Sequence, residues 1–219
     1  IWLVKNAITY LAYNQKSLKM KNKIKVPREI IIASHNQGKV KEINILLNDI
    51  GIKASPISDY SQVEPIENGI SFKENALIKA RNAVNLSKIT SLADDSGLCV
   101  EALNGDPGIY SARWAGVNKD FNIAMSAIEE KLDGLNNKKA YFICALALIN
   151  EKNEEFVFEG RVNGTITFPK RGNMGFGYDP IFIPENHKIT FGEMNPIEKE
   201  LISHRAMAFK KLKENIIVK

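Results

Sequence analysis

The sequence is poor in cysteine, and it has no uninterrupted hydrophobic run of the length that crosses a membrane. Its two cysteines, Cys99 and Cys144, lie in separate apolar segments, without the spacing of metal ligands or of a disulfide framework. We therefore expect two buried free thiols, as is usual in a reducing cytoplasm, and a cytoplasmic protein with no membrane association.

Acidic residues are absent from the first 28 positions, although these positions carry seven of the 30 lysines and arginines. Residues 29–219 therefore hold 23 basic and 25 acidic residues, and the formal net charge of +5 comes entirely from the N-terminal segment. Residues 29–219 thus have more acidic than basic residues. Because sequence-independent binding of nucleic acid needs many lysine and arginine contacts, we expect no stable nucleic-acid complex.

The chain has 219 residues, of which 44% are hydrophobic, so it can bury one sizeable core. We expect residues 29–219 to form one domain. Residues 1–28 are expected to be a basic extension outside this domain. Three origins remain open for the extension: native chain, a targeting segment, or a start-site or cloning extension before Met20.

Strand and helix patterns alternate along residues 29–219, which predicts an α/β fold. A β-branched run over residues 29–34 leads into a small polar loop, and a helical pattern begins near Lys39. A connection of this kind can present backbone amides and a positive charge to an anion, although its glycine and lysine spacing is not that of a P-loop. An ordinary strand-to-helix turn would also explain the loop.

The apolar run that begins at Ser91 stops at two adjacent carboxylates, Asp94 and Asp95, which are followed by Ser96 and Gly97. We interpret this stretch as the end of a strand and a turn. Because side chains alternate along a strand, the two carboxylates should point in opposite directions, so that one can face a cleft. Adjacent carboxylates commonly hold a cation or a proton. In the alternative interpretation they only cap backbone amides of the turn.

Two further segments carry groups that suit a nucleotide. The loop over residues 172–180 combines glycines, which let a backbone approach a ligand, with Phe176, whose ring can stack on a planar base. His204 and Arg205 place two hydrogen-bond donors at the start of the last predicted helix. Each feature is common on its own, so the combination matters more than any member.

Six motifs, taken in order over about residues 29–215, resemble the inosine triphosphate pyrophosphatase family. They are Ser34-His35-Asn36-Gln37-Gly38-Lys39, Phe72-Lys73-Glu74-Asn75-Ala76, Asp94-Asp95-Ser96-Gly97-Leu98, Pro107-Gly108-Ile109-Tyr110-Ser111-Ala112-Arg113, Gly175-Phe176-Gly177-Tyr178-Asp179-Pro180 and Ser203-His204-Arg205. The resemblance implies a long, twisted mixed central sheet with flanking helices, arranged as two lobes around a nucleotide cleft. It also implies a homodimer.

The same resemblance implies an enzyme that hydrolyses the non-canonical purine nucleoside triphosphates ITP, dITP and XTP to the monophosphate and pyrophosphate, which cleanses the nucleotide pool. It implies that Asp95 is the proton acceptor and that Asp95 and Glu67 hold Mg²⁺. Contacts with the substrate are implied for Ser34, His35, Asn36, Gln37, Gly38, Lys39, Lys79, Ser96, Phe176, Gly177, Tyr178, Asp179, Lys199, His204 and Arg205. One departure is His35, where the family usually has glycine.

Two alternatives remain open. A Maf-like nucleotide pyrophosphatase would share the architecture and prefer other bases, but the Phe-Gly-Tyr-Asp and Ser-His-Arg segments argue against it. A nucleotide- or RNA-binding module without catalysis would use the basic N-terminal segment, and it would bind without turnover.

Overall fold

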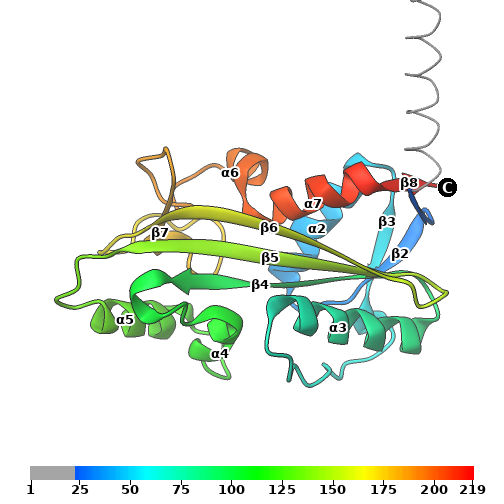
Figure 1. Ribbon diagram of the computed structural model, residues 1–219, viewed down its shortest axis with the longest axis horizontal. Helices are drawn as coiled ribbons and strands as arrows, with labels where there is room; N and C mark the ends of the chain where they lie inside the picture. The colour runs from blue at the N-terminus through cyan, green and yellow to red at the C-terminus, as the bar shows by residue number, and fades with distance from the viewer. Residues whose placement is uncertain (1–22) are drawn as a thin grey trace, which may run out of the picture.

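The computed structural model describes residues 23–219, and its centre is a curled, mixed six-stranded sheet with the strand order β3-β2-β4-β5-β6-β7 (Figure 1). The three strands at one edge are parallel, and the remaining neighbours are antiparallel. The predicted mixed sheet is thus confirmed. In chain order the strands are β2 (Glu29–Ile32), β3 (Lys53–Pro56), β4 (Ser91–Val100), β5 (Lys139–Ile149), β6 (Glu155–Ile166) and β7 (Phe182–Pro184).

Helices cover both faces of the sheet, as the α/β prediction requires (Figure 1). One face carries α3 (Phe72–Ser87), α4 (Ser111–Trp114) and α5 (Phe121–Lys131). The other carries α2 (Gln37–Asp49), α6 (Pro196–Ile202) and α7 (His204–Asn215). Separate apolar clusters fill the space under α2 and α7, under α3, and around α5 with β7. The molecule therefore has a core at each end of the long strands.

The position of α3 follows from its sequence. The Ser71 hydroxyl caps the helix by accepting a hydrogen bond from the Glu74 amide at 3.2 Å. Small side chains recur on the buried face at Ala76, Ala80 and Ala83, and they let the helix lie close to β4 and β5. This close approach places the middle of α3 next to the two carboxylates of β4.

The predicted turn at Asp94 is wrong, because β4 continues without interruption to Val100. The strand stays paired with β5 along its whole length, and this pairing outweighs the turn preference of the Asp-Ser-Gly sequence. On its other edge, β4 pairs with β2 only as far as Leu92. Beyond that point the Leu98 amide donates to Ser111 Oγ instead, at 3.0 Å. The two carboxylates therefore lie in the middle of a strand, at a fork that opens between β2 and β4.

The prediction that residues 1–28 lie outside the domain is also wrong, for residues 24–26. Ile24–Val26 form β1, which pairs in parallel with β8 (Ile216–Val218) near the C-terminus. Val26 is buried in the core under α2 and α7, so an apolar contact fixes this strand. The rest of the predicted extension, residues 1–22, lies outside the described residues. Within residues 23–219, no helix is long and apolar enough to cross a membrane.

Candidate functional site

A cavity of about 570 Å³ lies at the fork between β2 and β4. Of the residues that the sequence analysis assigned to a site, only Gln37 and Gly38 do not line it. Gly38 nevertheless lies against a residue of the cavity wall, because a Cβ there would lie 3.1 Å from the ring of Phe176. The segments chosen from the sequence thus come together in one place. Whether each residue contacts a substrate stays a prediction.

The loop between β2 and α2 is held by its own polar side chains. Ser34 Oγ accepts a hydrogen bond from the Asn36 amide at 3.2 Å, and Asn36 Oδ1 accepts one from the Lys39 amide at 3.2 Å. Asn36 is thereby the N-cap of α2. This arrangement turns the start of the helix and the side chain of Lys39 toward the cavity.

His35 has a contact that glycine could not make. Its Nε2 donates to the Ser61 carbonyl at 2.9 Å, and its Nδ1 lies 3.6 Å from Glu64 Oε1. The ring therefore ties the β2–α2 loop to the loop that follows β3. The departure from the usual glycine adds a link between two walls of the cavity.

Asp94 is an ion-pair centre that is completely buried. Its Oδ1 lies 2.5 Å from Lys39 Nζ and accepts a hydrogen bond from Ser96 Oγ at 3.1 Å. Its Oδ2 accepts hydrogen bonds from Arg205 Nε and from Cys144 Sγ, each at 3.0 Å. Burial by itself would raise the pKa of Asp94, but the charges of Arg205 and Lys39 hold this pKa well below its usual range. Asp94 is therefore an anion that fixes two cations.

Asp95 points to the opposite face of the sheet, as the alternation of side chains predicts. Its Oδ1 accepts a hydrogen bond from Lys79 Nζ at 2.9 Å, while its buried Oδ2 has no partner among residues 23–219. Burial raises the pKa of Asp95 above its usual value, although Lys79 and Lys39 oppose the shift. Asp95 thus has one oxygen fixed and one ready to accept a proton or a cation.

Lys79 joins Asp95 to Glu67, whose Oε1 lies 2.7 Å from the same ammonium group. Burial would lower the pKa of Lys79, but the two carboxylates raise it above its usual value. The ammonium group therefore remains charged and balances the two acids. Because Lys79 lies on α3 and Glu67 lies in the loop after β3, this contact joins the two elements at the cavity.

The acid pair fits a hard divalent cation. Asp95 Oδ2, which has no partner among residues 23–219, and the carboxylate of Glu67 would supply oxygen ligands to such an ion from one wall of the cavity. Residues 23–219 contain no group of three or more acidic, histidine or cysteine side chains that could hold a metal on its own. Mg²⁺ is typically held by one or two carboxylates together with substrate phosphates, so two acids match this ion.

Asp179 shapes the glycine-rich loop at the other end of the cavity. Its Oδ2 accepts hydrogen bonds from the Phe176 amide at 2.8 Å and from Lys199 Nζ at 2.7 Å. Gly175 has a φ of +76°, and a Cβ there would clash with Asp179 Oδ2, so glycine is required. Burial raises the pKa of Asp179 despite the Lys199 charge. The loop thus holds the ring of Phe176 at the cavity wall.

His204 and Arg205 begin α7 beneath this loop. The ring of His204 stacks on Phe142 with centroids 4.8 Å apart, and its buried Nδ1 has no partner in the described part of the chain. Burial and the nearby Arg205 and Lys199 charges keep the pKa of His204 well below its usual value. His204 is therefore neutral near pH 7, with one ring nitrogen that can donate and one that can accept.

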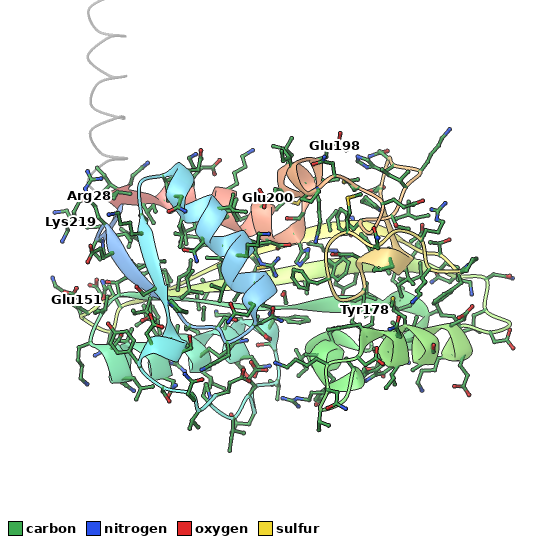
Figure 2. The ribbon with its side chains drawn as sticks, turned by 180° about the vertical axis from the view of Figure 1, so that it is seen from behind. Arg28, Glu151, Tyr178, Glu198, Glu200 and Lys219 are labelled. Atoms are coloured by element: carbon green, nitrogen blue, oxygen red, sulfur yellow. The ribbon has the colours of Figure 1, made fainter. Side chains whose placement is uncertain are left out.

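Two residues have positions that the sequence analysis did not foresee. Glu42 on α2 pairs with Lys199 Nζ at 3.3 Å and also with Arg205 Nη1, and both of these partners line the cavity. Its position three residues after Lys39, on the same helical face, was the available signal. Tyr178, labelled in Figure 2, is buried and donates its hydroxyl to the Ser111 carbonyl at 2.8 Å. Its ring packs edge-on against Phe121 with centroids 5.2 Å apart.

An α/β fold whose cavity combines carboxylates, lysines and an aromatic glycine-rich loop fits the class of hydrolases that act on acid anhydrides. The comparison with family models then identifies the particular group. The model of the Ham1 family matches residues 30–215, and the chain belongs to this family. The resemblance inferred from the six motifs is therefore confirmed.

Similar proteins support the same assignment. The chain is 51% identical over 187 residues to a dITP/XTP pyrophosphatase of Caulobacter vibrioides, which covers 84% of this chain and 96% of that protein. A dITP/XTP pyrophosphatase of Zymomonas mobilis is 46% identical over 189 residues, covering 85% and 90%. Among solved structures, the Staphylococcus aureus Ham1 protein superposes with a TM-score of 0.77 at 39% identity, covering 84% of this chain and 96% of that one.

Proposed function

We propose that the protein hydrolyses non-canonical purine nucleoside triphosphates, namely ITP, dITP and XTP, to the monophosphate and pyrophosphate. The observation that carries the proposal is the buried oxygen of Asp95 that has no partner within residues 23–219 and lies beside Lys79 and Glu67, in a chain 51% identical to a dITP/XTP pyrophosphatase. The Maf-like alternative is not favoured, because the similar proteins are dITP/XTP pyrophosphatases.

The reaction uses the groups in the following way. A water oxygen attacks the α-phosphorus, its proton passes to the Asp95 carboxylate, and the bond from the α-phosphorus to the oxygen that bridges to the β-phosphorus breaks. A carboxylate within hydrogen-bond reach of the attacking water can accept this proton. Lys39 and Lys79 neutralise the phosphates, and the start of α2 offers backbone amides. A bound divalent cation adds further neutralisation and favours deprotonation of the water.

Pyrophosphatases of this family are metal-dependent in general. We propose Mg²⁺ as the metal of this chain, held by Asp95, Glu67 and the substrate phosphates. The chemistry of the donors supports it, because both side chains offer only oxygen and Mg²⁺ prefers such ligands.

Base selection belongs to the other end of the cavity. The ring of Phe176 stacks on the purine, and donors from His204, Arg205 and nearby backbone amides pair with the oxygen at position 6 of hypoxanthine or xanthine. Adenine carries an amino donor at that position, which leaves these groups unpaired. Guanine passes this test, so its exclusion depends on its 2-amino group. The guanidinium carbon of Arg205 lies 5.9 Å from the centroid of the Phe176 ring, which supports this assignment.

We also propose a cytoplasmic homodimer. The two buried free cysteines agree with a reducing compartment. Exposed Ile197 and Leu201, four residues apart on α6, offer an apolar surface for a second copy. Light scattering on the purified protein tests the dimer, which a monomer mass at micromolar concentration would contradict.

The test of the function is product analysis with ITP and Mg²⁺. We expect IMP and pyrophosphate in equal amounts as the first products. Orthophosphate with IDP would mean attack at the γ-phosphorus and would contradict the proposal. Tight binding of ITP or single-stranded RNA without any turnover would instead favour a binding module.

A further inference from the structure

The loop that carries Glu67 is not anchored by apolar packing. The hydrophobic side chains of this loop are largely exposed: Val63 is 75% exposed, Ile66 is 84% and Ile70 is 86%. Burial of such side chains is what normally fixes a segment of chain. The position of Glu67 must therefore depend on polar contacts from neighbouring elements.

Two such contacts bear on the backbone around Glu67. Arg113 Nη2 donates a hydrogen bond to the Glu67 carbonyl at 2.6 Å. Two residues later, the Gly69 amide donates to Oδ1 of Asn75, a fully buried residue of α3, at 2.9 Å. A Cβ at Gly69 would lie only 2.7 Å from the same oxygen, so this contact needs glycine. The backbone of the loop is thus held from α4 on one side and from α3 on the other.

The anchor of Arg113 is itself firmly placed. The hydroxyl of Ser111, two residues earlier, accepts a hydrogen bond from the Leu98 amide at the free edge of β4. The same hydroxyl donates a hydrogen bond to the Gly108 carbonyl at 2.6 Å. The carbonyl of Ser111 accepts the Tyr178 hydroxyl, which connects α4 to the glycine-rich loop. Although its side chain is exposed, Arg113 therefore projects from a backbone that is fixed to β4.

We propose that Arg113 is a positioning residue that sets where the Glu67 carboxylate lies, and so sets the affinity of the acid pair for the divalent cation. The inference rests on the proposed function, because it assumes that Glu67 and Asp95 hold this ion. Partners that orient a metal ligand are typically worth about 10–100-fold in metal affinity or activity when removed. The competing role for Arg113 is direct contact with phosphate, since it also lines the cavity.

The experiment compares Arg113→Gln with Arg113→Lys. Glutamine removes the charge and the reach of the guanidinium, whereas lysine keeps a donor that can approach the same carbonyl. The matched control is Arg81→Gln, which removes an arginine of α3 that pairs with Glu155 outside the cavity. Melting temperatures of all variants check that each is folded.

Two readouts are needed. The first is steady-state hydrolysis of ITP, with the Mg²⁺ concentration for half-maximal rate determined separately from KM for ITP at saturating Mg²⁺. The second does not depend on turnover: Mn²⁺ binding followed by electron paramagnetic resonance in the presence of an α,β-imido analogue of ITP.

For Arg113→Gln we expect the half-maximal Mg²⁺ concentration and the Kd for Mn²⁺ to rise about tenfold, with KM for ITP at saturating Mg²⁺ within about twofold of wild type. Arg113→Lys should recover part of the loss, and Arg81→Gln should match wild type. Unchanged metal affinity in Arg113→Gln, or a rise in KM for ITP alone, would overturn the inference. Failure of the proposed function is separate, because it would appear as absent pyrophosphate release by the wild type.

Discussion

Arg205 donates its Nε hydrogen to Asp94 Oδ2 at 3.0 Å across 111 residues of sequence, and so joins the start of α7 to the middle of β4. Both side chains are almost completely buried. A buried charge is costly to leave without its partner, so this pair makes the fold depend on the same residues that line the cavity.

The first prediction concerns Asp94→Asn, which leaves Arg205 and Lys39 without their shared anion. Removing one partner of a buried pair typically costs about 3–5 kcal/mol of unfolding free energy. Urea unfolding at pH 7 should show a loss of this size, whereas the exposed pair of Asp49 and Lys213 provides a control, since Asp49→Asn should change stability by less than about 1 kcal/mol. A loss below about 1 kcal/mol in Asp94→Asn would contradict the role of Asp94.

The same carboxylate should also give the stability a pH dependence. Because the pKa of Asp94 is lower in the folded protein than in the unfolded chain, its contribution is present above the unfolded pKa of about 3.9. It is lost as the pH falls through the folded pKa. Unfolding free energy should therefore fall more steeply below about pH 4 in the wild type than in Asp94→Asn.

The second prediction is that Asp95→Asn keeps nucleotide binding and loses turnover. The amide cannot accept the proton of the attacking water, and loss of a general base typically costs about 10²–10⁴-fold in rate. Calorimetry with an α,β-imido analogue of ITP measures binding, and pyrophosphate release measures turnover. A variant that retained half of the wild-type rate would exclude Asp95 as the proton acceptor.

The third prediction concerns base selection. ATP should be a very poor substrate, by as much as about 10⁴-fold in kcat/KM relative to ITP, because its amino group leaves the position-6 donors unpaired. GTP should be rejected less completely. Arg205→Lys keeps the charge near Asp94 and Glu42 but loses the planar guanidinium, so KM for ITP should rise and the ITP-to-ATP ratio of kcat/KM should narrow. An unchanged ratio would show that Arg205 does not read the base.

The fourth prediction addresses His35. His35→Gly restores the residue usual in the family and removes the hydrogen bond to the Ser61 carbonyl. Loss of one such bond, together with the added backbone freedom of glycine, should lower unfolding free energy by about 1–2 kcal/mol. The rate with saturating ITP should remain within about threefold of wild type, because His35 has no part in proton transfer. A rate loss beyond tenfold would give the imidazole a direct role with the substrate.

The sequence predicted elements and cavity loops correctly where a local residue pattern is enough to determine them. The β-branched run over residues 29–34 predicted β2 correctly, and the helical pattern that begins near Lys39 predicted α2. The loop between β2 and α2 and the glycine-rich loop of residues 172–180 both reach the same cavity. In these places side-chain chemistry alone indicates the structure.

The errors arose where distant pairing decides the outcome. The Asp-Ser-Gly sequence of β4 favours a turn, but ten residues of β5 pair with it and keep it extended. The three residues of β1 are too few to predict a strand on their own, and their partner strand lies almost 200 residues later, at Ile216–Val218. Glu42 received no role from the sequence, because its partner Arg205 lies 163 residues later, on α7. None of these contacts is visible within a short window of sequence.

In the proposed reaction, water attacks the α-phosphorus of the triphosphate. Hydrolysis of ITP in water enriched with ¹⁸O, followed by mass spectrometry of the products, shows which phosphorus the water attacks. Attack at the α-phosphorus should leave one ¹⁸O atom in the phosphate of IMP and none in the pyrophosphate. Label in the pyrophosphate, or in orthophosphate released with IDP, would place the attack at another phosphorus and exclude the proposed reaction.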